Sequence, residues 1–376
     1  MRKRHRSLLV VLVLAYVLVL AYVLVLAAVL HARAARTESA APVSTATSDR
    51  VLRYIRERFG LADTVKLTIN SWQPFSDPAF YEAAVNVDYG KEKKTQPVYL
   101  TRNQEYLVVG KLVPMTSAGK EEISKNIRQL FKVPENIGIT VGPLRKSAYP
   151  TLYATTVSLD QAGKKQTQEF YVTADHRCLV VGNVFKLGVD PRAEALRTIS
   201  VRNQPFQGAA GAPVTIVEYA DLECPMCARL HEFLEKKLVP RYAGKVRVVF
   251  KEFPLVQIHD WSTTAAIANE CVYRIKPEAY VPYRSLIFQS QAAINATNVR
   301  DMLLAFGDQL GVDHMQLAGC LDAKSTLPQI DQDLKEGKQL NILSTPTSFV
   351  NGRIIVGMPS EDLFYKTVDE VLADAK

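Results

Sequence analysis

The pattern of apolar and polar positions divides the chain into three stretches. Residues 8–30 are an unbroken apolar run of Leu, Val, Ala and Tyr, and residues 37–48 are small or polar with nothing to bury. From residue 49 onward, stretches with the period of an amphipathic helix alternate with stretches rich in β-branched residues. The pattern predicts an apolar N-terminal segment (1–36), a flexible linker (37–48) and folded domains after it.

The apolar run of 23 residues at 8–30 is long enough to cross a bilayer. A transmembrane helix needs about 20 apolar residues, whereas the core of a signal peptide has only about 7–15. We therefore expect an uncleaved membrane anchor. Ala32-Arg33-Ala34 resembles a small-residue cleavage site, so a cleaved signal and a secreted protein stay open as the alternative. Four basic residues precede the run and two follow it, which by the positive-inside rule leaves the body of the chain outside the cytoplasm.

The next region contains an internal repeat with a constant offset of 72 residues and no gap. Each copy begins with the pattern of an amphipathic helix, at Val51–Phe59 and at Ile123–Phe131, and continues with strand patterns separated by turn residues. Identical residues keep the register: Ile55 and Ile127, Phe59 and Phe131, Tyr81 and Tyr153, Val85 and Val157, and Gly110 and Gly182. Two tandem small α+β modules are therefore predicted, at 49–118 and 119–191.

After a predicted linker at 192–212, residues 213–376 alternate between strand and helix patterns. The apolar run Val214–Ala220 predicts a buried strand, and a helical pattern from Cys227 to Leu238 follows it. The further expected elements are a strand at Val246–Phe253, a long helical insertion at 262–337, strands at Thr347–Val350 and Ile354–Val356, and a final helix from Ser360. This order indicates an α/β domain with a helical insertion.

Charge and ligand spacing exclude two classes of function. The 376 residues carry a formal net charge of +8, but six of these charges lie in residues 1–36, which contain no acidic residue. Only +2 remains for the rest of the chain, so we expect no nucleic-acid partner. His176 has no second histidine or cysteine at ligand spacing, and we expect neither a metal nor a cofactor.

Cys224-Pro225-Met226-Cys227 is the clearest candidate for chemistry. It follows the predicted strand and opens the predicted helix, so Cys224 is expected at a helix N-terminus, where free N–H groups favour an anionic sulfur. Thiol–disulfide exchange needs one acidic thiol and a second thiol close enough to resolve the mixed disulfide. We predict Cys224 as the nucleophile and Cys227, one turn deeper, as the resolving thiol. Taken alone, the pair would also fit half of a zinc site.

Three further motifs accompany this pair. They are Val217–Asp221 before it, Ala265–Cys271 in the helical insertion, and Ser344–Gly352, which contains Thr345-Pro346. Together they resemble the DsbA-like branch of the thioredoxin fold, and the resemblance runs along residues 213–376. It implies a thioredoxin fold with a helical insertion and a protein disulfide oxidoreductase activity through the Cys224/Cys227 pair.

The resemblance also implies how substrate is held. Thr345-Pro346 would be the family's cis-proline pair, whose backbone pairs with an extended substrate, with Pro225 and Met226 beside it. Met226 is a departure, because a thioether is a weaker hydrogen-bonding group than the residue that relatives carry there. We expect a less oxidising pair than in the strongest members.

Other site residues rest on the same resemblance. Glu218 would be a buried acid below Cys227 that relays a proton, with an outward-facing strand position as the alternative. Cys271 and Cys320 would form a structural disulfide, which an exported protein favours over two spare thiols. His231, on the helix face of Cys227, is expected at the surface.

The repeats resemble a different protein module. Their pattern, seen best in Phe170–Asp175 and Leu179–Leu187, resembles the N-terminal dimerisation domain of the DsbC/DsbG disulfide isomerases, which have one such module per chain where this chain has two. The resemblance implies a role in binding or assembly and a possible dimer through the repeat modules. Cys178 falls at the place of Tyr106 in the first copy, which favours an ordinary core position.

The sequence therefore predicts a membrane-anchored, extracytoplasmic thiol–disulfide oxidoreductase that forms or rearranges disulfides in exported proteins. Its expected partners are unfolded or cysteine-containing exported proteins and a membrane redox partner that recycles the pair. A disulfide isomerase with chaperone character, a reductant-type carrier, and a cell-envelope binding protein in which the repeats are the working part remain the alternatives.

Overall fold

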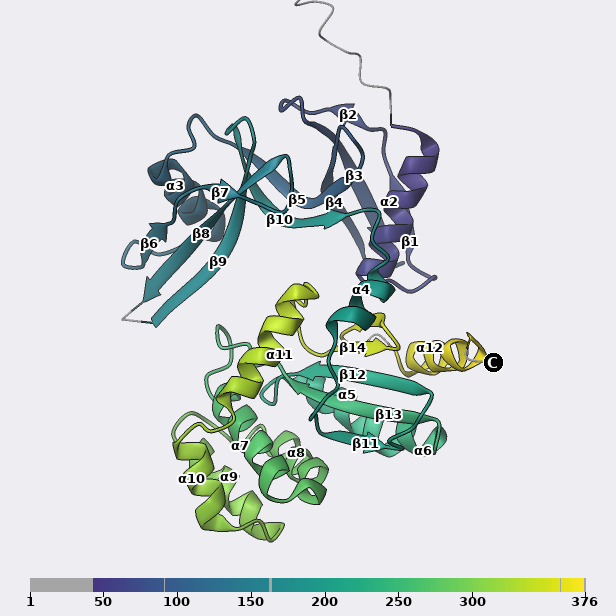
Figure 1. Ribbon diagram of the computed structural model, residues 1–376, viewed down its shortest axis with the longest axis vertical. Helices are drawn as coiled ribbons and strands as arrows, with labels where there is room; N and C mark the ends of the chain where they lie inside the picture. Colours follow the sequence, from purple (N-terminus) through teal and green to yellow (C-terminus); the bar gives the residue numbers. More distant parts are fainter. Residues whose placement is uncertain (1–42, 91, 162–163, 359, 375–376) are drawn as a thin grey trace, which may run out of the picture. The chain divides into compact units, whose positions relative to one another are not determined.

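The structure is a computed structural model that describes residues 43–90, 92–161, 164–358 and 360–374 (Figure 1). The predicted membrane anchor at residues 8–30 lies outside these ranges, as does the first half of the predicted linker at 37–48. Within the described ranges, no helix combines the length and apolar character needed to cross a membrane.

Each repeat folds as one helix followed by five strands. The first contains α2 (Thr45–Arg58), β1 (Lys66–Ile69), β2 (Gln73–Pro74), β3 (Phe80–Asp88), β4 (Lys93–Thr101) and β5 (Tyr106–Pro114). The second contains α3 (Lys120–Phe131), β6 (Gly138–Val141), β7 (Arg145–Lys146), β8 (Leu152–Gln161), β9 (Lys164–Thr173) and β10 (Cys178–Lys186). Helix α2 begins inside the predicted linker, because Thr47 is buried and donates a hydrogen bond to Gln104 Oε1 at 2.8 Å.

The two repeats share one ten-stranded sheet. Eight strands follow the order β1-β3-β4-β5-β10-β9-β8-β6, while β2 pairs with β3 and β7 with β8. Strands β5 and β10 join the copies as an antiparallel pair in which Gly110 lies opposite Gly182. These glycines are equivalent residues of the two copies, so the pairing relates the repeats by a local two-fold axis. Both have positive φ angles, +152° and +154°, and a Cβ on either would collide with the backbone of the facing strand.

The C-terminal domain is built on a five-stranded sheet with the order β11-β13-β12-β14-β15 (Figure 1). Its strands are β11 (Phe206–Gly208), β12 (Val214–Ala220), β13 (Val246–Glu252), β14 (Thr347–Val350) and β15 (Arg353–Val356). Strand β12 pairs in parallel with β13 and antiparallel with β14, so it is central and buried on both faces. Its β-branched sequence suits that position.

The predicted linker at 192–212 contributes two elements of this domain, and a helical pattern up to Val201 accounts for the first of them. Helix α4 (Pro191–Thr198) is capped by the Asp190 side chain, which accepts a hydrogen bond from the Arg192 N–H at 2.8 Å. Strand β11 pairs with the edge of β13, where Phe206 lies opposite Val249. Its three residues are too short to give a strand pattern among the surrounding glycines and alanines.

Helices cover the sheet. Helix α5 (Pro225–Phe233) continues as a π-helical turn, Leu234–Leu238, and a short α6 (Val239–Arg241). The insertion consists of α7 (Ser262–Ile275), a 3₁₀ turn (Pro277–Ala279), α8 (Tyr280–Gln289), α9 (Val299–Gln309), α10 (His314–Asp322) and α11 (Leu327–Gln339). The insertion shares one apolar core with Cys224 and Cys227, whereas α12 (Glu361–Asp374) packs with Phe233 and the strands in a second core. The insertion therefore forms one wall of the cysteine site.

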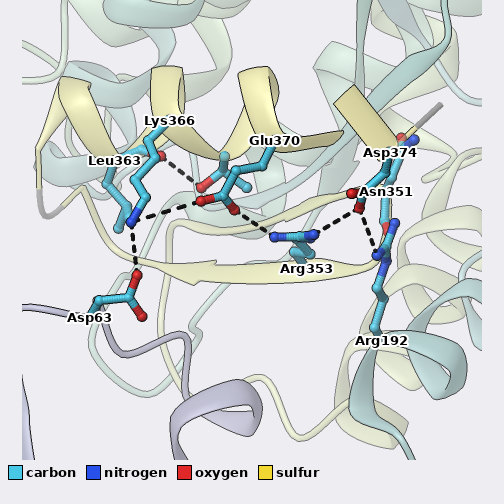
Figure 2. A network of polar contacts seen from close by, with 9 residues as sticks. Asp63, Arg192, Asn351, Arg353, Leu363, Lys366, Glu370 and Asp374 are labelled. Atoms are coloured by element: carbon cyan, nitrogen blue, oxygen red, sulfur yellow. Dashed lines mark hydrogen bonds and ion pairs between the residues drawn. The ribbon is translucent and has the colours of Figure 1, made fainter. Parts of the chain in front are cut away.

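A surface network joins α12 to β15 and to Asp63, which lies between α2 and β1 (Figure 2). Arg353 binds Glu370 at 2.6 Å and Asp374 at 2.9 Å, and Lys366 binds Asp63 at 2.8 Å. The side chains are partly exposed, so each pair contributes only about 0–1 kcal/mol. We assign this network a structural role.

Candidate active site

Cys224 lies where a strand, a turn and a helix meet. Strand β12 ends at Ala220, and Cys224 is the N-cap residue of α5, with Pro225 in its first turn. Proline suits this position because its missing N–H would have no partner there. The N–H groups of Cys227 and Ala228 bond to the Cys224 carbonyl at 3.1 and 3.2 Å. The Cys224 sulfur thus lies at the positive end of the helix.

Asp221 holds the turn that carries Cys224. Its carboxylate accepts hydrogen bonds from the N–H groups of Glu223 at 2.8 Å and Leu255 at 2.6 Å. It also lies 2.8 Å from His259 Nδ1, and its carbonyl accepts the N–H of Cys224 at 3.0 Å. One buried side chain therefore connects the turn before the nucleophile to the segment after β13.

The environment of Cys224 makes its thiol acidic. A hydrogen bond from the Cys227 side chain lowers the pKa of Cys224 to about 5, helped by the backbone of Cys227 and Met226 and the side chain of Thr345. Burial acts in the opposite direction and is outweighed. At neutral pH the free Cys224 is therefore a thiolate, which is the reactive form of a cysteine.

Cys227 has the opposite character. Its side chain is fully buried, and burial, followed by the neighbouring Cys224 and Glu218, raises its pKa well above the ordinary value. The Asp221 N–H donates to its sulfur at 3.4 Å. The pair thus combines an acidic thiol with a buried thiol of high pKa, as an attacking and a resolving cysteine require.

The residues expected to hold substrate lie beside the nucleophile. The Thr345–Pro346 peptide is cis, and the Cys224 thiol donates to the Thr345 carbonyl at 3.5 Å. Pro225 is exposed and Met226 half-buried in the first turn of α5. The structure thus brings Pro225, Met226 and Thr345 together around one sulfur.

Glu218 lies inside the domain, so its alternative outward-facing position is excluded. The side chain is fully buried, and its Oε2 lies 3.3 Å from a guanidinium nitrogen of Arg284. Burial raises the pKa of Glu218, and Arg284 opposes that rise. Lys251, on the neighbouring strand, binds Asp333 and Glu336 instead, at 3.0 and 2.7 Å.

Two residues of this site were not singled out by the sequence. Arg284 lies on α8 and touches both Glu218 and Glu252, and the Gln291 amide donates to the Cys224 carbonyl at 3.1 Å. Both belong to the helical insertion, where an isolated polar residue gives no local signal. Only the folding of the insertion over α5 brings them near the cysteines.

The remaining cysteines and His231 complete the account of the predicted residues. Cys271 and Cys320 form a disulfide that joins α7 to α10. Cys178 is a free, buried thiol whose pKa burial raises to about 11. The expectation of a surface position for His231 is wrong, because the ring is only 3% exposed and packs on Phe288, 5.1 Å between ring centres. In the described part of the chain, no group of three or more His, Cys, Asp or Glu side chains could hold a metal.

The comparisons with known proteins each match a part of the chain. A curated relative, disulfide bond formation protein D of Bacillus subtilis, is 29% identical over 178 residues, which are 46% of this chain and 79% of the relative. The Na(+)/H(+) antiporter NhaA 3 of Salinispora tropica is 31% identical over 147 residues, but the match spans only 21% of that protein. Among solved structures, oxidised BdbD from Bacillus subtilis is 25% identical, with a TM-score of 0.42 over 46% of this chain and 95% of that one.

A family model described as thioredoxin matches residues 200–370. The matched segment begins at the end of α4 and includes β11, the cysteine pair, the insertion and most of α12. It therefore covers every element that positions Cys224 and Cys227. Residues 200–370 therefore form a domain of the thioredoxin fold.

Proposed function

We propose that this chain is an extracytoplasmic thiol–disulfide oxidoreductase that forms or rearranges disulfides in exported proteins through Cys224 and Cys227. The observation that carries the proposal is the contrast between the two thiols, since the pKa of Cys224 is lowered to about 5 and that of the buried Cys227 is raised. Such a contrast is the requirement for exchange through a mixed disulfide.

The reaction starts from the oxidised pair when the protein acts as an oxidant. A substrate thiolate attacks the Cys224 sulfur, the Cys224–Cys227 bond breaks, and the Cys227 sulfur leaves with the electron pair and takes up a proton. A second thiolate of the substrate then attacks the substrate sulfur of the mixed disulfide, and Cys224 leaves as a thiolate. The substrate loses two electrons and the cysteine pair gains them. Glu218 is the buried acid proposed to exchange the proton with Cys227.

The acidity of Cys224 favours the oxidising direction. A stabilised thiolate stabilises the reduced protein, and a stable reduced form makes the disulfide a strong oxidant. The Met226 thioether tempers this tendency, because it gives the thiolate only weak stabilisation from its side chain. An isomerase would use the same thiolate to open wrong disulfides, and the experiment below separates these directions.

The surface near Cys224 suits an unfolded polypeptide. Val256, Ile258 and Leu343 are large apolar side chains that are 51%, 72% and 67% exposed. They belong to the segments that contact the site, since Leu255 binds Asp221 and Thr345 contacts Cys224. Exposed apolar groups around a reactive sulfur would hold a chain that has not yet buried its own core.

The proposed location and assembly rest on other parts of the chain. The closed Cys271–Cys320 disulfide supports an oxidising compartment, and the apolar run at 8–30 supports a membrane anchor facing it. A membrane redox partner would recycle the pair. The dimer through the repeat modules stays a prediction, which light scattering of the full chain would test.

The decisive experiment uses the full chain in detergent. Incubated with reduced, unfolded ribonuclease, the oxidised protein is expected to restore ribonuclease activity, and Cys224→Ala is expected to abolish this effect. Reactivation of scrambled ribonuclease by the reduced protein, without oxidation of the reduced substrate, would assign isomerisation instead. Equal behaviour of the wild type and Cys224→Ala in both assays would contradict any redox function and favour a binding role for the repeats.

A further inference from the structure

Beneath the cysteine pair lies a guanidinium to which the steps above assign no role. Arg284 of α8 is fully buried, and its nitrogens lie 3.3 Å from Glu218 Oε2 and 3.1 Å from Glu252 Oε1. The guanidinium also packs over the rings of Phe250 and Phe288, 5.0 and 5.1 Å from their centres. A buried cation must be balanced by nearby groups because it has lost its hydration, and here the two carboxyl groups supply that balance.

The two carboxyl groups depend on Arg284 to different degrees. Glu252 Oε1 also accepts hydrogen bonds from Asn269 Nδ2 at 2.7 Å and from the Tyr280 hydroxyl at 3.3 Å. Glu218 has Arg284 on Oε2, and among the described residues neither its buried Oε1 nor the buried Oε2 of Glu252 has a hydrogen-bond partner. An ionised carboxylate inside a protein is stable only when donors or cations face it. Glu218 therefore relies on Arg284 for its charged form far more than Glu252 does.

Glu218 in turn acts electrostatically on the resolving cysteine. Its carboxylate raises the pKa of Cys227, after the larger effects of burial and Cys224, and Cys227 acts electrostatically on Arg284 as well. The guanidinium, the carboxyl group and the buried sulfur thus form one coupled set. An interaction that acts on Glu218 will act on the proton of Cys227.

We propose that Arg284 is a positioning residue for the resolving step, which holds Glu218 in place and in its ionised form so that Glu218 can take the proton of Cys227. The inference rests on the proposed function. When a reduced pair has captured substrate on Cys224, the Cys227 S–H bond breaks and its proton passes to Glu218. The Cys227 sulfur bonds to the Cys224 sulfur, and the substrate sulfur leaves as a thiolate with the electron pair.

The surroundings predict that loss of Arg284 and loss of the Glu252 charge shift the pKa of Glu218 in opposite directions. The ionisable groups around Glu218 and Arg284 are Cys224, Cys227, His231, Glu252, Glu270, Tyr280 and, farther away, Asp333. None of these adds a cation beside Glu218, since burial lowers the pKa of His231 to about 3. Loss of Arg284 should therefore raise the pKa of Glu218, and loss of the Glu252 charge should lower it.

The test separates capture from resolution in the full chain held in detergent. The reduced protein is mixed with oxidised glutathione, quenched with acid and analysed by mass spectrometry, which resolves the reduced, mixed-disulfide and closed forms. For Arg284→Met we expect capture by Cys224 to change less than about twofold. Resolution should slow about tenfold at a pH on the acidic limb of its pH profile, which equals an upward shift of that limb by about one pH unit. For Glu252→Gln the acidic limb should move to lower pH.

Two further variants serve as controls. Arg284→Lys keeps a cation, and we expect it to restore part of the resolution rate. Lys251→Met removes another buried cation of this domain, which binds Asp333 and Glu336, and it should leave the acidic limb at the wild-type pH. A variant that only loosened the fold would slow capture and resolution together.

The outcomes are distinct. If the acidic limb of the resolution rate stays at the wild-type pH in both Arg284→Met and Glu252→Gln, the inference is overturned. The proposed oxidoreductase function would be unaffected by that result. No reaction of the wild type with glutathione would overturn the proposed function and this inference with it. If Arg284→Met fails to fold, Glu252→Gln decides the question. An acidic limb that stays in place or moves to higher pH in Glu252→Gln would contradict the proposal that Arg284 balances Glu218.

Discussion

The two folded regions of the chain differ in where they place charge. In the described part of the repeats, ion pairs such as Lys93–Asp88 and Arg145–Glu169 lie on partly or largely exposed side chains, and the buried charged residues are Arg58 and Asp77. In the thioredoxin-fold domain, Arg284, Lys251 and Glu218 are buried beneath the active site. A buried ion pair adds little to stability compared with well-packed apolar residues. The comparison indicates that the proposed chemistry, and not stability, accounts for the buried Arg284–Glu218 pair.

The largest expected contrast is between the thiols of the two regions. With a pKa of about 5 for Cys224 and about 11 for Cys178, Cys224 has about four orders of magnitude more thiolate at neutral pH, offset by two to three orders through its lower intrinsic nucleophilicity. We expect iodoacetamide to label Cys224 at least about tenfold faster than Cys178 in the reduced protein. Peptide mapping after timed labelling measures both rates.

The sign of the pH dependence gives this contrast a second test. Below the pKa of about 5, protonation should reduce the labelling of Cys224 about tenfold per pH unit, and above it the rate should be flat. Labelling of Cys178 should still rise toward pH 10. Two parallel profiles would show that the helix N-terminus and the neighbouring donors leave Cys224 an ordinary thiol.

The next contrast concerns stability. Arg284→Met removes one partner of a buried ion pair and should lower the free energy of unfolding by about 3–5 kcal/mol. Arg145→Met removes the exposed partner of Glu169 in the repeats and should cost about 0–1 kcal/mol. Denaturant unfolding followed by circular dichroism measures both. Similar losses for the two variants would mean that the position of the charge does not matter.

A smaller effect is expected for the disulfide of the insertion. Replacing Cys271 and Cys320 by Ala opens a loop with a sequence separation of 49 residues and should cost about 2–4 kcal/mol. The measurement uses a background with Cys224→Ala and Cys227→Ala, so that reductant acts only on this bond. Dithiothreitol should then destabilise that background and leave unchanged the variant in which Cys271 and Cys320 are replaced as well. An equal response of both proteins would contradict the disulfide between Cys271 and Cys320.

The smallest expected effect lies where the repeats meet. Gly110→Ala places a Cβ against the facing backbone at a positive φ angle and should cost about 1–3 kcal/mol. Gly188→Ala is the matched control, because a Cβ there meets nothing within 4 Å. Thermal unfolding of both variants measures the difference. A loss for Gly188→Ala as large as that for Gly110→Ala would remove the local two-fold contact as the cause.

The active site could be predicted largely because its parts are local in sequence. A strand, a Cys-x-x-Cys segment and a helix follow one another directly, and Thr345-Pro346 precedes a short strand. Each gives a periodic or compositional signal of its own. The thioredoxin-fold prediction is confirmed for residues 200–370 by the family model.

The charged interior could not be predicted, because it depends on how distant segments pack. Arg284 meets Glu218 across 66 positions of sequence, and Lys251 meets Asp333 across 82. Before folding, Arg284 and Glu218 are each only one charged residue in an apolar stretch. The same reason explains why His231 was placed wrongly at the surface, since Ser285 and Phe288 of α8 and Phe250 of β13 cover it only in the folded domain.

The antiparallel contact between β5 and β10 joins equivalent segments of the two repeats within one polypeptide. In an assembly of identical chains, every substitution would appear on both sides of such a contact. Here the copies can diverge separately, as Tyr106 and Cys178 already have. Duplication inside one gene has thus given the sheet an asymmetric pair of halves, each free to acquire its own surface.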